Sequence, residues 1–125
     1  MKISHYAVPT EMKNILLNTP EVTEMVGGNI SPVIASEDTE GDYIALQRDG
    51  FKQERNKMGL TYRWPFVYVY IVSADSQRSQ DIAERVKEAL EGKFYDPDID
   101  IYLEDDSEEY ESGKYIQVLK FLVII

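Results

Sequence analysis

Carboxylates are the most concentrated chemically active groups in this sequence. Nine acidic residues and no basic residue lie between Asp96 and Glu111. The segment opens with the D-x-D-x-D spacing of a calcium loop at Asp96 to Asp100, and Ca²⁺ prefers oxygen ligands of this kind. The rest of the motif is missing, because Ile101 stands where the loop needs glycine and Ser107 where it needs a bidentate glutamate. The sequence therefore does not predict a calcium loop.

The second half of the acidic segment is a dense cluster of carboxylates. Such a cluster could bind a divalent cation weakly, but the favoured interpretation is the solvated tip of a hairpin. Glycoside hydrolysis would need two carboxyl groups across a cleft, one of them in an apolar pocket, whereas these side chains crowd on one exposed segment. The cluster consists of Glu104, Asp105, Asp106, Glu108 and Glu109.

The sequence contains few residues suited to other kinds of catalysis. His5 is the only histidine, and neither Ser4 nor Ser73 has the sequence context of a nucleophilic serine. The chain has no cysteine, which excludes disulfides, thiolate metal sites and iron–sulfur clusters. No glycine-rich phosphate-binding motif is present. We expect no enzyme, no cofactor and no metal site; a hydrolase with an unrecognised carboxylate site is the remaining enzymatic alternative.

Charge disfavours nucleic acid as a partner. The formal net charge of the 125 residues is −10, and an acidic surface repels the phosphate backbone. Aromatic residues around Trp64 could stack on bases, but packing in the core or in an interface explains them better. No run of 18 or more apolar residues and no signal-peptide core is present. We therefore expect no sequence-specific nucleic-acid binding, no membrane span and a cytoplasmic origin.

One stretch is basic, although the chain as a whole is acidic. Between Arg48 and Arg63 lie five basic residues and two acidic ones. The part from Asp49 to Gly59 has no apolar periodicity, so we expect a loop that becomes ordered on assembly. Lys52, Arg55 and Lys57 are its candidate contacts with a charge-complementary protein surface, and a plain solvated loop is the alternative.

Helical periodicity and capping residues predict three helices. The first runs from Thr10 to Asn18 with Thr10 as its cap, and the second starts at Pro20 after Thr19 and ends at Gly27. A long third helix starts at Asp75-Ser76 and continues to about Glu91. Its apolar stripe of Ile82, Ala83, Val86, Ala89 and Leu90 should face a sheet.

Strand patterns occupy much of the rest of this single domain, residues 1–125. We expect a short strand at 32–35, strands at 43–48, 66–72 and 99–103, and a last strand at 114–125. A polar loop should join the last two. The order predicts an α+β two-layer sandwich, in which a mainly antiparallel sheet of four to five strands carries the helices on one face.

The other sheet face then lacks a cover. Depending on register, Tyr68 or Val69 points to it, and Tyr70 would follow Tyr68. The last seven residues, Leu119 to Ile125, contain only Lys120 as a polar residue, so we expect the apolar ones to be buried in the core, in an oligomer interface, or both. An uncovered apolar face predicts oligomerisation.

The order of motifs resembles one family of virion proteins. Met25-Val26-Gly27-Gly28-Asn29-Ile30-Ser31-Pro32 is followed by Tyr43-Ile44-Ala45-Leu46, then by Val69-Tyr70-Ile71-Val72-Ser73-Ala74-Asp75-Ser76 and by Val86-Lys87-Glu88-Ala89-Leu90-Glu91-Gly92. This arrangement resembles the tail terminator or head–tail joining proteins, also called tail completion or minor tail proteins, of long-tailed phages and prophages.

The resemblance implies a non-enzymatic virion component that forms a ring, such as a hexamer, and stops growth of the tail tube. Its partners would be further copies of itself, tail tube proteins and the head connector. It would reside in the virion and, during assembly, in the bacterial cytoplasm. The alternative is a small cytoplasmic α+β protein-interaction domain without a virion role. For either, the candidate interface residues are Lys52, Arg55, Lys57, Tyr68, Tyr70, Glu104, Asp105, Asp106, Glu108 and Glu109.

Overall fold

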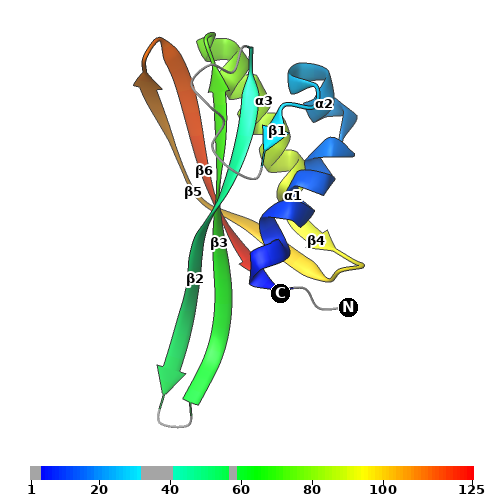
Figure 1. Ribbon diagram of the computed structural model, residues 1–125, viewed down its shortest axis with the longest axis vertical. Helices are drawn as coiled ribbons and strands as arrows, with labels where there is room; N and C mark the ends of the chain where they lie inside the picture. The colour runs from blue at the N-terminus through cyan, green and yellow to red at the C-terminus, as the bar shows by residue number, and fades with distance from the viewer. Residues whose placement is uncertain (1–3, 32–40, 57–58) are drawn as a thin grey trace.

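The computed structural model describes residues 4–31, 41–56 and 59–125 and shows an α+β fold of two layers (Figure 1). A six-stranded sheet forms one layer, and the helices pack against one of its faces. This arrangement confirms the predicted fold class. It differs in detail, because the sheet has six strands and one of its pairings is parallel.

The helical layer consists of a 3₁₀ turn, η1 (His5–Ala7), and helices α1 (Val8–Leu17), α2 (Pro20–Val26) and α3 (Ser76–Leu90). Helix α3 has the predicted cap, since the Asp75 side chain accepts a hydrogen bond of 3.1 Å from the Arg78 N–H. Helix α1 begins two residues before Thr10, so Thr10 is not its cap. Thr19 precedes α2 as predicted, but its hydroxyl donates to the Ile15 carbonyl oxygen (2.7 Å) instead of capping α2.

The strands are β1 (Ile30–Ser31), β2 (Tyr43–Asn56), β3 (Gly59–Ser73), β4 (Gly92–Phe94), β5 (Ile99–Glu111) and β6 (Lys114–Ile124). Their order in the sheet is β1-β2-β3-β6-β5-β4. Every pairing is antiparallel except that of β1 with β2. The strand predicted at 32–35 lies outside the described residues.

Two predicted loops are strands. β2 continues past Arg48 to Asn56 and pairs with the first half of β3, and β5 continues past Leu103 to Glu111. Backbone hydrogen bonds to one neighbouring strand hold these two extensions in place. Their sequences therefore need no alternation of apolar and polar residues. The turn between β5 and β6 is only Ser112 and Gly113, both at positive φ.

The core lies between the sheet and the helices. On the central strands the helix-facing side chains are Val67, Val69, Ile71, Leu119, Phe121 and Val123, all buried. From α3, Ile82, Val86 and Leu90 meet them with no exposed surface, whereas Ala83 and Ala89 are partly buried at the edge of the stripe. The stripe prediction is therefore confirmed.

The last strand is not buried on both faces. Leu119, Phe121 and Val123 point into the core, but Ile124 is 37% exposed and Leu122 is half-buried. Successive side chains of a strand point to opposite faces, and only one face of this sheet is covered by helices. The terminus is therefore buried in the core on one face only, and burial of Leu122 and Ile124 would require an oligomer interface.

Polar contacts fix the position of α3. The Gln117 side chain of β6 donates to the hydroxyl of the buried Ser79 (3.1 Å), which itself donates to the Ser76 carbonyl oxygen (2.7 Å). Arg78 reaches the Asp42 carboxylate (2.6 Å) and the Met25 carbonyl oxygen (3.0 Å). These contacts join α3 to β6, to the start of β2 and to the end of α2.

Candidate interaction surface

The described helices cover only one face of the sheet and leave the opposite face without a helix (Figure 1). Tyr68 and Tyr70 of β3 lie on it, half-buried, because Val67, Val69 and Ile71 take the helix-facing positions. The register therefore places Tyr68 on the uncovered face of the sheet and Val69 on the face covered by helices. We call this surface the open face; its other apolar members are Phe66, Tyr102, Ile116, Val118, Leu122 and Ile124, together with Tyr43, Ala45 and Val72, which form a small buried cluster on it.

Aromatic rings and Lys120 contact one another at the centre of the open face. The Lys120 ammonium lies 4.5 Å from the ring centroid of Phe66 and 5.9 Å from that of Tyr68. Tyr68 stacks on Tyr70 with 6.1 Å between centroids. Cation–π contacts of this kind contribute about 0.5–1 kcal/mol at exposed sites and hold both groups in place. The result is a preformed apolar patch with fixed positive charge, which suits a protein partner.

The five candidate carboxylates lie side by side in sequence but not on one face. Asp105 and Glu109 pair across the sheet with Lys120 and Ile116, which belong to the open face. Asp106 and Glu108 pair with Leu119 and Gln117 on the helix side. Glu104 lies at the register shift between these residues and Leu103. All five are exposed.

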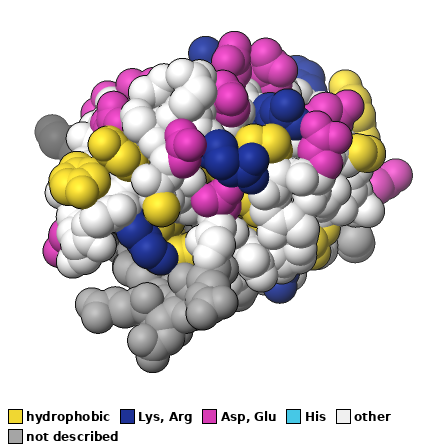
Figure 2. Space-filling model, turned by 90° about the horizontal axis from the view of Figure 1, so that it is seen from above, with side chains coloured by type: hydrophobic (Ala, Val, Ile, Leu, Met, Phe, Trp, Pro, Cys, Tyr) yellow, Lys and Arg dark blue, Asp and Glu magenta, His cyan; other side chains and the backbone are white. Residues whose placement is uncertain are grey.

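This alternation prevents a compact cluster. Among the side chains that the structure describes, no group of three or more histidine, aspartate or glutamate residues converges as a metal site would require. The arrangement gives β5 a negative rim along both faces instead. Figure 2, which looks onto the end of the molecule at the top of Figure 1, shows acidic and basic side chains interspersed, with hydrophobic ones in separate patches.

The three basic candidates lie on the hairpin of β2 and β3. The backbone of Lys52 pairs with Trp64, and that of Arg55 with Leu60. Lys57 and the side chains of 49–65 lie outside the described residues. The hairpin extends beyond the rest of the sheet, because β6 pairs with β3 only from Phe66 onward (Figure 1). The basic and acidic hairpins thus occupy opposite ends of the sheet.

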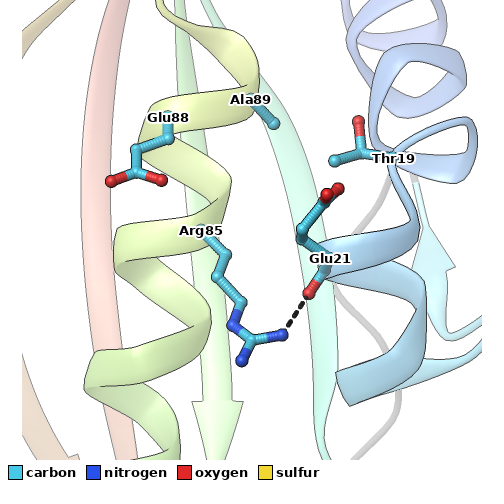
Figure 3. A pocket seen from close by; sticks show the side chains of 5 residues that line it. All are labelled: Thr19, Glu21, Arg85, Glu88 and Ala89. Carbon is cyan, nitrogen blue, oxygen red and sulfur yellow. Dashed lines mark hydrogen bonds between the residues drawn. The ribbon is translucent and has the colours of Figure 1, made fainter.

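A groove between α2 and α3 offers no catalytic arrangement. It is lined by Thr19, Glu21, Arg85, Glu88 and Ala89 (Figure 3). Its arginine is already used structurally, since Arg85 donates to the Glu21 carbonyl oxygen (2.8 Å) and pairs with the Glu24 carboxylate. Arg85 therefore joins α3 to α2, and the groove presents no free cation to a ligand.

Of the apolar members of the open face, the candidate residues from the sequence included only Tyr68 and Tyr70. Lys120, Tyr102 and Leu122 lie beside the predicted tyrosines only because β3, β6 and β5 are neighbours. Strand alternation from the buried Phe121 would have placed Leu122 and Lys120 on the outer face, and the order of the strands was the missing information.

Comparison with solved structures identifies a similar fold. A chain from the virion of a native gene transfer agent particle superposes on 94% of this chain and 92% of its own length, with a TM-score of 0.76 and 14% sequence identity. The two chains share one fold. No protein-family model matches the sequence, and no curated protein matches it. Among the described helices, none combines the length and apolarity that a membrane crossing needs.

Proposed function

We propose that this protein is a structural component of a phage or prophage virion. It acts at the junction of head and tail, where copies of the chain form a ring that completes the tail. The role is non-enzymatic, and the partners are the tail tube and the head connector. The observation that carries the proposal is the shared fold with a chain of a gene transfer agent virion over nearly the full length of both chains.

Three features of the surface support an assembly role. The open face carries half-buried aromatic side chains that a protein partner would cover, including Phe66, Tyr68 and Tyr70. The two hairpins end at opposite ends of the sheet and differ in charge. Unlike patches on one chain make heterologous contacts, and such contacts close into rings when the rotation between copies allows it.

The mass of the protein in solution tests the ring. Light scattering during gel filtration, over a range of concentrations, should show a species of several copies, and negative-stain microscopy should show annular particles. A chain that stays monomeric at every concentration would contradict the ring and favour the alternative, a small protein-interaction domain.

The position in the particle needs a second measurement. Antibody labelling of particles from cells that carry the gene should give a single site between head and tail. Label along the whole tail, or over the capsid, would refute the junction role while leaving a virion role intact.

A further inference from the structure

The sheet has two long edges whose backbone is paired on one side only. β4 pairs with β5 only at Ile99–Ile101, so no described strand borders residues 102–111 on the side away from β6. β1 pairs with β2 only at Ile44 and Ala45, so no described strand borders residues 46–56 on the side away from β3. A strand edge of this kind is a template for pairing with another chain.

The two edges carry opposite charge. Residues 102–111 of β5 include six acidic residues and no basic one. The projecting arm, which we define as residues 48–56 of β2 with 59–63 of β3, includes four basic residues and two acidic ones. Like charges opposite one another destabilise a strand pair, whereas opposite charges stabilise it. Two β5 edges therefore repel each other, and the β5 edge of one copy attracts the arm of another.

We infer that the β5 edge of one subunit pairs with the β2 edge of the arm of a second copy of this chain. The inference rests on the proposed ring and names its contact. It makes each subunit both donor and acceptor, as a closed ring of identical copies requires.

Strand direction agrees with this contact. β2, β3, β6 and β5 each run antiparallel to the next, so β5 runs antiparallel to β2 within one subunit. In a closed ring the strands tilt from the rotation axis, typically by about 35–45°, and neighbouring strands across each junction keep their relative directions. The strand added at each junction is then antiparallel too, which is the more stable arrangement, and the helices of all copies stay on one face of the continuous sheet.

The contact also requires the second copy to be offset along the strands, as in a closed sheet. The ladders place Asp106 of β5 level with Leu46 of β2. Lys52 lies about 20 Å further along β2 at roughly 3.3 Å per residue. The neighbour must therefore shift along the strands, and a stagger of strands is what closing a sheet on itself demands.

Cysteine pairing tests the contact directly, because the chain has no cysteine of its own. One protein carries Ser107→Cys on β5, and a second carries Lys52→Cys or Gln53→Cys. Two adjacent positions of β2 are used so that the test does not depend on the orientation of either side chain. Under mild oxidation, a mixture should give a cross-linked dimer with one of the two arm variants. Each variant alone should give none, and neither should Ser107→Cys mixed with Glu88→Cys, an exposed control on α3.

Charge exchange provides an independent readout. Lys52→Glu with Arg55→Glu should weaken self-association at least tenfold, and so should Asp106→Lys with Glu108→Lys. An equal mixture of these two proteins should associate again, because the lysines introduced on the β5 edge of one protein then face the glutamates introduced on the arm of the other. Glu88→Lys with Glu91→Lys adds the same charge at exposed positions of the helical layer and should leave association unchanged.

The outcomes separate this inference from the proposed function. Ring particles that form without mixed cross-links, and that survive both charge reversals, would overturn the edge contact and leave the ring standing. Cross-linking of Ser107→Cys with itself in those particles would overturn it as well, in favour of a symmetric contact. A chain that shows neither cross-links nor oligomers would overturn both.

Discussion

Phe121 and Leu122 are neighbours in β6 whose truncation should have very different effects on folding. Among the described side chains, Phe121 is the largest with no exposed surface, and its strand partners are Val67 and Leu103. Leu122 points to the open face and is half-buried. The two substitutions test which face of the sheet is covered, at one place in the chain and on one strand.

Phe121→Ala should lower the free energy of unfolding by about 3–5 kcal/mol, the usual cost of removing a buried phenylalanine and leaving a cavity. Leu122→Ala should cost about 1 kcal/mol, less than the roughly 1.5–3 kcal/mol of a fully buried leucine, because part of its surface is already in water. At about 4 °C per kcal/mol for a domain of this size, Tm should fall by about 12–20 °C and about 4 °C respectively.

The assay is thermal and urea unfolding followed by circular dichroism at low protein concentration, so that association does not add to the measured stability. Phe121→Leu, which keeps most of the volume, should recover most of the loss and serves as the control. Equal losses for Phe121→Ala and Leu122→Ala would refute the assignment of faces. So would a larger loss at Leu122.

Two further perturbations act on the same core. Val86→Asp buries an unpaired charge on α3 beneath the sheet and should abolish cooperative unfolding, whereas Lys87→Asp on the exposed side of the helix should not. If the Val86→Asp protein folds with a native near-ultraviolet circular dichroism spectrum, α3 is packed differently. Deleting residues 123–125 removes the buried Val123 and its pairing with Ile101, and should cost at least about 1.5–3 kcal/mol; an unchanged Tm would contradict the buried position of Val123.

Local signals predicted the helices well. Asp75 accepts a hydrogen bond at the start of α3, and Pro20 and Gly27 delimit α2, because capping and helix termination depend on the backbone within one turn. The stripe of α3 was predictable for the same reason, since helical periodicity places Ile82, Val86 and Leu90 on one face.

The lengths of β2 and β5 were not predictable in this way. Their second halves pair with one strand only and carry charged side chains, so no hydrophobic alternation marks them. β1 and β4 span two and three residues, too short for any pattern, and the parallel pairing of β1 with β2 leaves no local trace.

The candidate interaction surface likewise has features that the sequence alone predicts and features that depend on the tertiary structure. The charges of the acidic segment and of the basic arm, the aromatic residues of β3 and the lack of catalytic motifs are properties of residue type and are readable along the chain. The tertiary structure decided that Tyr68 faces outward, that the carboxylates of β5 alternate between two faces, and that the two charged hairpins end at opposite ends of one sheet. Such facts depend on the pairing of strands distant in sequence, and a shift of one residue in that pairing would exchange the faces.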